Sequence, residues 1–271
     1  MKLNILAFTA LLFLCATSCK QDNQFIDTAE NDFQKMKEHL SSTYGFSPES
    51  IEETPTDFIV EGDQLFSKST YWNDHGPCSE HEHSVGAPPA ADGTVADRKH
   101  YRSTYLIDKY KWPTIKVNIS EPGIPQSWRD AIIDAVEEWN YADGWFHYEV
   151  TYLNYSVNGS INVKMSGDNI GDLTVASCYY PTSSRKPGSP MHLNPKSNDL
   201  AYSKKVFAIV HEIGHALGIR HTDQGQGTLI TNVPYDCKNF SDWSSVMQPY
   251  VTNWAGFTNC DYEAYWGLYG W

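Results

Sequence analysis

Apolar and polar positions follow regular periods from residue 101 onward, a pattern that is typical of a globular domain. A helix is predicted over residues 127–139, where apolar side chains recur at helical spacing, and Ser127 is its expected N-cap. Strands are predicted at residues 114–119, 146–152, 161–165, 175–180 and 191–194. This order of elements predicts an α+β fold with a mixed sheet.

A second helix, expected over about residues 199–217, carries the most informative polar side chains. Its apolar face is made by Val206, Ile209, Val210, Ile213 and Leu217. His211 and His215 are four positions apart, so their side chains project side by side from successive turns. Two imidazole groups at this spacing can bind one metal ion.

Three neighbouring residues extend this chemistry. Glu212 directly follows the first histidine, so it is badly placed to bind the same ion and instead reaches a water beside it. Gly218 tolerates a positive φ and ends the helix, which lets the chain reverse sharply. His221 can then return as the third ligand of a tetrahedral zinc ion with one open position.

The chain begins with the features of an export signal, expected over residues 1–18. A positive start precedes an apolar run at 5–14 that is too short to span a bilayer, and small residues follow it. Ala16-Thr17-Ser18-Cys19 resembles a bacterial lipobox, so Cys19 is the expected lipidated residue and membrane anchor. Cleavage by an ordinary signal peptidase is the alternative. We therefore expect a lipoprotein of the bacterial cell envelope, in the outer membrane and exposed at the surface.

Two segments of different composition separate this signal from the globular pattern. Residues 19–72 are polar, with a helix expected over 32–42 and a strand over 57–60, and are interpreted as a tether and candidate propeptide. Residues 73–98 contain many turn formers without an apolar period, which predicts a linker. The globular domain is expected to span residues 99–271.

Composition and charge exclude some classes of function. Of the 271 residues, 41% are hydrophobic and 14% are aromatic, so the chain can bury a substantial core. Its 20 Lys and Arg residues are outnumbered by 33 Asp and Glu residues. The resulting net charge of −13 argues against nucleic acid as a ligand.

Four cysteines remain after Cys15 leaves with the signal and Cys19 is lipidated. They are Cys78, Cys178, Cys237 and Cys260. Because an exported chain leaves the reducing cytoplasm, two disulfides are expected, although the sequence does not select their connectivity. Cys237 with Cys260 would close a loop around residues 245–247. Four buried or free thiols are the alternative.

Residues 211–221 read His-Glu-Ile-Gly-His-Ala-Leu-Gly-Ile-Arg-His and resemble the long zinc signature of metzincin peptidases. The additional glycine and the third histidine at fixed offsets make this signature far more specific than two histidines on a helix. The HEIGH string, with residues 222–223, residues 101–104 and the helix at 128–140, resembles the bacterial dual-action HEIGH metallopeptidases. This resemblance covers most of residues 98–271.

The resemblance also implies the remaining fold and site. A metzincin-like domain has a mixed twisted sheet, two long helices and a C-terminal helix. Residues 268–270 resemble the end of this last helix. Residues 245–247 resemble the Met-turn, which places Met247 beneath the zinc ligands. Astacins and serralysins carry a zinc-bound tyrosine two residues after this methionine, but Pro249 holds that position here. Tyr250 is therefore expected to be a packing aromatic or an exposed wall of the cleft.

The implied activity is zinc-dependent hydrolysis of peptide bonds by a monomeric endopeptidase. One catalytic zinc ion would activate water, while Glu212 takes the proton as general base and delivers it to the leaving amine. The strand at 175–180 is expected to form the sheet edge that binds extended protein or peptide substrates. The alternative is a binding or adhesion lipoprotein on the same scaffold, against which the retained Glu212 argues.

Other candidate ligands have weaker support. A second metal site could form in the loop that contains His75, Cys78, His81 and His83. A solvated loop is the preferred interpretation, because no helix or hairpin fixes their spacing. Calcium could bind at Asp168, Asn169 and Asp172. These residues lack the spacing of a known calcium loop, so a polar turn is preferred, and His192 is interpreted as an ordinary strand residue.

Latency is suggested by the N-terminal segment. Glu61-Gly62-Asp63 resembles the prosegment motif with which astacins place an aspartate on their own zinc, so Asp63 is a candidate inhibitory ligand. Its carboxylate would displace the water that Glu212 must activate. An ordinary strand-to-turn ending is the alternative. Cleavage in the exposed 73–98 linker would release the block.

Overall fold

The computed structural model describes residues 34–38, 40–41, 48–53, 57–60, 64–67, 99–166, 170, 174–222, 227–239 and 242–270. The chain divides into two compact units, Met1–Met36 and Lys37–Trp271, and the fold and the site below belong to the second. Among the described residues, none of the helices combines the length and the apolar character that a membrane crossing requires.

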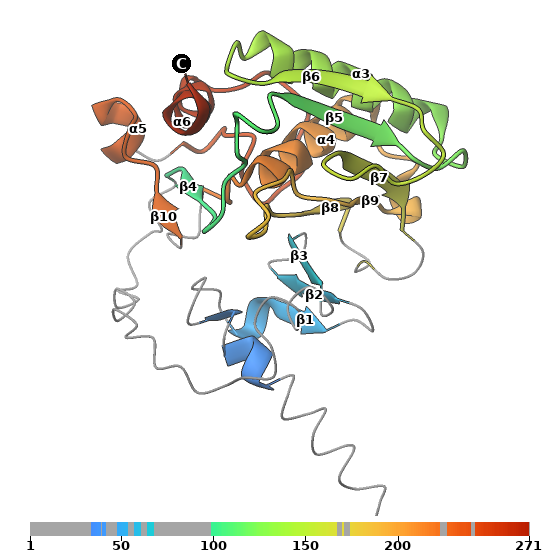
Figure 1. The fold of residues 1–271 in the computed structure, drawn as a ribbon, viewed down its shortest axis with the longest axis horizontal. Coiled ribbons are helices and arrows are strands. Elements are labelled where there is room, and N and C mark those ends of the chain that lie inside the picture. The colour runs from blue at the N-terminus through green and yellow to red at the C-terminus, as the bar shows by residue number, and fades with distance from the viewer. Residues whose placement is uncertain are drawn as a thin grey trace, which may run out of the picture. The chain divides into compact units, whose positions relative to one another are not determined.

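One mixed sheet runs through the second unit (Figure 1), and its described strands follow the order β1-β2-β3-β8-β9-β7-β5-β6. The strands are β1 (Ile51–Glu53), β2 (Asp57–Val60), β3 (Gln64–Ser67), β5 (Thr114–Ile119), β6 (His147–Thr151), β7 (Ile161–Met165), β8 (Ala176–Tyr179) and β9 (Met191–Leu193). β6, β5, β7 and β9 pair in parallel, and β8 is antiparallel to β9. The predicted mixed sheet is confirmed.

The long helices of the described residues lie close to this sheet (Figure 1). They are α3 (Gln126–Tyr141), α4 (Tyr202–Leu217) and α6 (Asn259–Tyr269). α3 packs against β6, α4 packs against β8, and α3 and α4 pack against each other. The short elements are η1 (Pro48–Ser50), η2 (Pro195–Ser197), α5 (Tyr235–Asn239), β4 (Tyr101–Arg102) and β10 (Thr228–Leu229). Two long helices followed by a C-terminal helix are as predicted.

The core between these elements fixes α4 in place. Trp128 and Trp139 of α3 are 0% and 2% exposed, and truncating a side chain of this size costs on the order of 3–5 kcal/mol. The indole Nε1 of Trp139 donates a hydrogen bond of 3.1 Å to the carbonyl of Val210 in α4. This bond anchors α4 one residue before His211.

The prediction of Ser127 as an N-cap is wrong. α3 begins at Gln126, and Pro125 precedes it in an extended conformation without a side-chain cap. The fixed φ of proline suits the position before a helix. Ser127 lies within the first turn, where its hydroxyl accepts a 2.7 Å hydrogen bond from the ammonium group of the buried Lys205.

The expectation that residues 175–180 form a sheet edge is also wrong. β8 pairs with β9 on one side and in parallel with β3 on the other, where Gln64 is opposite Cys178 and Leu65 is opposite Tyr179. β3 belongs to an antiparallel meander with β1 and β2. Pairing between segments so distant in sequence is not encoded in the local period of β8. The N-terminal segment therefore covers the edge that was expected to bind substrate.

The cysteines follow the sequence expectation only in part. Cys237 and Cys260 form a disulfide that joins α5 to the first turn of α6, so the loop expected around residues 245–247 is confirmed. Cys178 is a free thiol with 0% exposure. A second disulfide that includes Cys178 is thus contradicted, because this side chain is enclosed in the core between β8 and its neighbours.

Candidate metal centre and active site

Three histidine side chains converge at the C-terminal end of α4. His211 and His215 lie in the last turns of the helix, and His221 follows it. The Nε2 atom of His221 is 3.0 Å from Nε2 of His211 and 3.1 Å from Nε2 of His215. The three residues are 5%, 0% and 0% exposed. Together they could hold a metal ion.

Backbone carbonyl groups determine which ring nitrogen carries the proton in two of these histidines. Nδ1 of His211 lies 2.7 Å from the carbonyl oxygen of Val246, and Nδ1 of His215 lies 2.8 Å from that of Ile219. Because a carbonyl oxygen only accepts, each neutral ring carries its proton on Nδ1 and presents a lone pair at Nε2. Lone pairs that converge in this way favour a cation between them. The donor set therefore fits zinc, whose catalytic sites use three protein ligands of this type.

Gly218 returns the chain to this centre. Its backbone is left-handed, with φ 95° and ψ 17°, and its amide donates a 2.8 Å hydrogen bond to the carbonyl of His215. A Cβ at this position would also lie 2.8 Å from the hydroxyl of Ser103. The turn at Gly218 is thus as predicted, and it places His221 beside the two helical histidines.

Residues 245–247 form a tight turn against α4. The amide of Gln248 donates to the carbonyl of Ser245 at 3.2 Å, and Met247 is 1% exposed. The Met247 sulfur is so near α4 that a Cβ on Gly214 would lie only 2.5 Å from it. Sequence reasoning did not explain Gly214, although its place between two expected ligands was a signal of close packing.

Glu212 lies on α4 directly after His211 and is 3% exposed. Burial raises the pKa of the Cys178 thiol well above its ordinary value, and the negative charge of Glu212 raises it further. Glu212 is therefore close to β8. The ring of Tyr180, which follows β8, packs edge-on against His215 with the ring centroids 5.3 Å apart. β8 and the residue after it border the metal centre.

Two other candidates lie among the described residues, and the rest lie outside them. Tyr250 is 60% exposed, which excludes the packing role but agrees with an exposed aromatic. His192 lies in β9, where its ring is 6.4 Å from that of Tyr179. The candidates outside the described residues are Cys19, Asp63, His75, Cys78, His81, His83, Asp168, Asn169 and Asp172.

A second polar cluster next to residues 245–247 was missed by sequence reasoning. Its members His100, Asp242 and Asp261 bring their ligand atoms within 4.8 Å of one another. Thr258 and Asp261 form a capping box at the start of α6. The Thr-x-x-Asp spacing of this box was the available sequence signal.

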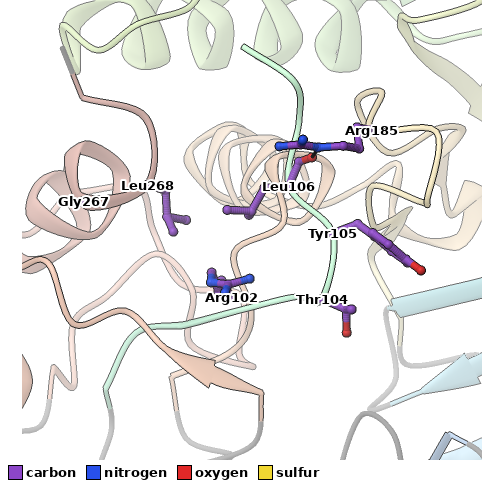
Figure 2. Close-up of a pocket in the computed structure, with 7 residues that line it drawn as sticks. All are labelled: Arg102, Thr104, Tyr105, Leu106, Arg185, Gly267 and Leu268. Carbon is purple, nitrogen blue, oxygen red and sulfur yellow. Dashed lines mark hydrogen bonds between the residues drawn. The ribbon is translucent and has the colours of Figure 1, made fainter.

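Figure 2 shows a pocket of about 530 Å³ that none of the clustered histidines lines. Its lining residues are Arg102, Thr104, Tyr105, Leu106, Arg185, Gly267 and Leu268. Leu106 lies between the two arginine side chains in this view, and Leu268 lies to one side of them (Figure 2). The metal centre is therefore defined by its converging side chains and not by this cavity.

Converging imidazoles on a helix, with a glutamate beside the first of them, are the chemistry of a metallopeptidase. The model of the dual-action HEIGH metallopeptidase family matches residues 90–228, and the chain belongs to that family. Membership implies a zinc ion and protein or peptide substrates. The crystal structure of myroilysin is similar at 14% identity, covering 64% of this chain and 91% of that chain, with a TM-score of 0.35. No curated protein matches the chain.

Proposed function

We propose that this metallopeptidase is a zinc endopeptidase in which Glu212 is the general base. His211, His215 and His221 would hold the single zinc ion. The observation that carries the proposal is the convergence of three buried Nε2 atoms beside a buried carboxylate on the same helix. Zinc in such a site supplies Lewis acidity, which activates water and polarises a carbonyl group.

The residues of the chain have separate tasks in this reaction. Glu212 takes a proton from the attacking water and delivers it to the leaving amine. Because Glu212 is part of α4, its carboxylate is placed by the same rigid element as His211 and His215. The carbonyl groups of Val246 and Ile219 keep two imidazoles in the tautomer that binds metal.

Endopeptidase action is proposed because a sheet strand borders the centre. A strand edge binds an extended peptide through main-chain hydrogen bonds, which do not require a free chain end. β8 lies beside α4, and Tyr180 at its end touches His215. Substrate would pair with β8 on the side where β3 now lies.

We also propose that the enzyme is made in a latent form. The pairing of β3 with β8 supports this, since substrate and β3 compete for the same main-chain groups. Asp63, the candidate inhibitory ligand, directly precedes Gln64, which is opposite Cys178. Cys178 is in turn within the electrostatic reach of Glu212. The strand that begins directly after Asp63 in the sequence therefore pairs with the strand that borders the metal centre.

The proposed location is the bacterial cell envelope, with the monomeric enzyme held at the outer membrane by lipid on Cys19 and exposed at the surface. The lipobox-like residues 16–19 support the anchor. The disulfide between Cys237 and Cys260 supports export, because such bonds persist outside the reducing cytoplasm.

The general-base role is tested by Glu212→Ala. We expect turnover of an unstructured protein substrate to fall at least about 100-fold, because a positioned general base contributes typically 10²–10⁴-fold. Zinc content and the far-UV spectrum should stay unchanged, since the three histidines remain. Turnover is measured on the chain from residue 98 as well as from residue 20, so that latency does not hide it.

The matched control is Glu137→Ala, which removes an exposed carboxylate from α3 and should leave turnover unchanged. Normal turnover of Glu212→Ala would refute the role of Glu212. A zinc-loaded wild-type chain that cleaves no peptide of a large library would favour the binding or adhesion alternative.

A further inference from the structure

Asp261, in the first turn of α6, is 5% exposed and accepts four hydrogen bonds. Its Oδ1 atom accepts from Nε2 of His100 at 2.9 Å and from the hydroxyl of Ser245 at 2.6 Å. Its Oδ2 atom accepts from the amides of Val246 at 3.1 Å and Thr258 at 2.9 Å. One buried carboxylate thus joins three segments that are far apart in sequence.

This carboxylate is ionised and has no free acceptor position. Burial raises the pKa of Asp261, but the hydrogen bond and charge of His100, with the hydrogen bonds of Ser245 and Thr258, bring the pKa below its ordinary value. Each carboxylate oxygen has two lone pairs, and each here receives two donors. A metal ion at this cluster would have to break those bonds, so we interpret it as a hydrogen-bond network.

Val246 connects this network to the first zinc ligand. Its amide donates to Asp261, while its carbonyl accepts the Nδ1 proton of His211 at 2.7 Å. The position of Val246 therefore sets both the tautomer and the direction of the His211 ring.

Met247 connects the same network to the third ligand. Its amide donates to the hydroxyl of Ser245 at 3.0 Å, and that hydroxyl donates to Asp261. The carbonyl of Met247 accepts from the amide of Thr222, next to His221, at 3.0 Å. The turn held by Asp261 therefore supports the chain on both sides of the metal centre.

We infer that Asp261 is a positioning residue for the metal centre. Through Ser245 and Val246 it fixes the turn at residues 245–247, whose carbonyl groups orient His211 and hold the chain beside His221. The inference rests on the proposed role of the three histidines as zinc ligands. According to this inference, α6 and His100 contribute to the affinity for zinc, although neither of them carries a zinc ligand.

The size of the effect follows from the length of this connection. Groups that bond directly to a metal ligand typically change metal affinity 10–100-fold when they are removed. Asp261 acts through one intervening residue, Val246. We therefore expect an effect near the lower end, about 10-fold.

The test is Asp261→Asn in the full chain. The amide keeps the shape of the carboxylate but replaces an acceptor by a donor that faces other donors. The dissociation constant for zinc, measured by competition with a chelator, should rise about 10-fold. The absorption spectrum of the cobalt-substituted protein should shift, because it reports ligand orientation. The kcat value should fall while KM changes little, since Asp261 does not border β8.

Two further variants separate positioning from general stability. Asn118→Ala removes another buried polar side chain, which bonds to Thr151 and Leu153 and to no metal ligand. It should lower the Tm but leave the zinc dissociation constant within about twofold of the wild-type value. Ser245→Ala removes one donor to Asp261 and the acceptor of the Met247 amide, but keeps the bonds from the amides of Val246 and Thr258 to Asp261. It should therefore raise the dissociation constant by a smaller factor, and it serves if Asp261→Asn does not fold.

The outcomes distinguish the inference from the proposed function. Wild-type zinc affinity in folded Asp261→Asn or Ser245→Ala would overturn the positioning role while leaving the proposed function intact. Two zinc ions per wild-type chain, one of them lost with Asp261, would overturn it in favour of metal binding at the His100 cluster. A wild-type chain that binds no zinc would instead disprove the proposed function itself.

Discussion

Gly214 lies between the two helical histidines, and its missing side chain provides the space that the Met247 sulfur occupies. A Cβ on Gly214 would lie 2.5 Å from Sδ and 3.1 Å from Cε of Met247. Protein interiors are close-packed, so a methyl group cannot be added here without moving the sulfur. The glycine of the motif is thus explained by contact with the turn that follows the metal centre.

Gly214→Ala should therefore destabilise the protein even though alanine is the better helix former. Alanine gains about 1 kcal/mol over glycine in a helix interior, whereas overpacking a core typically costs about 1–3 kcal/mol. We expect a net loss of roughly 1 kcal/mol, measured by urea unfolding.

A double-mutant cycle with Met247→Ala identifies the cause. Removing the sulfur relieves the overlap, so the double variant should lose less stability than the sum of the single variants. Additive losses, or a Gly214→Ala variant more stable than wild type, would show that the Met247 contact is not limiting.

The site residues that lie within one short stretch of sequence could be predicted to come together. Those that come from distant stretches could not. His211, His215 and His221 share eleven positions of sequence, and the geometry of one helix and one turn brings them together. The cluster of His100 and Asp261 combines the start of the domain with α6, and no local spacing records that contact. The Val246 carbonyl that contacts His211 is 35 positions away in sequence and was not predictable for the same reason.

At the level of elements, sequence reasoning did not predict β3 and therefore wrongly expected β8 to have a free edge. β5 and β7 have the predicted bounds, because alternating apolar residues mark a strand locally. The neighbour of β8 depends on tertiary pairing and was expected to be substrate. Because β3 pairs with β8, the latency proposal is supported by strand pairing as well as by the sequence resemblance at Asp63.

The latency proposal is tested by comparing three forms of the enzyme. The chain from residue 20 should be less active than the chain from residue 98, because only the longer form contains β3. Asp63→Ala in the longer form should restore part of the activity, since the candidate zinc ligand is lost while β3 still competes with substrate for β8. Cleavage of a fluorogenic peptide library measures all three.

Glu52→Ala serves as the control, because it removes an exposed carboxylate of β1 in the same segment and should leave the longer form inactive. If all forms are equally active while the longer ones remain uncleaved, residues 20–72 are only a spacer.

At the scale of the whole molecule, the proposed lipid anchor would decide where the enzyme acts. The lipobox-like residues 16–19 make Cys19 the proposed point of attachment. Acyl chains stabilise membrane attachment by about 0.8 kcal/mol per buried CH₂. The full chain should fractionate with membranes, and Cys19→Ala should shift it to the soluble fraction.

Cys15→Ala is the matched control, since Cys15 directly follows the apolar run of the expected signal, precedes the lipobox-like residues, and should not change fractionation. Mass spectrometry of the N-terminal peptide would identify the lipid. A Cys19→Ala variant that stays in the membrane fraction would contradict the anchor.

The edge of β8 that β3 covers also affects how two copies of the enzyme could associate. If β3 departs on activation, as proposed, β8 would present unsatisfied amide and carbonyl groups at the edge of the sheet. Such a rim accepts any extended strand, whether from a target or from a second activated copy. The exposed strand edge that would bind substrate could thus also bind a second copy, which would lead to filament-like stacking and self-digestion. Charge repulsion opposes both only weakly, because residues 99–271 carry 14 Lys and Arg residues against 17 Asp and Glu residues, and most of the negative charge lies in the part that activation would remove.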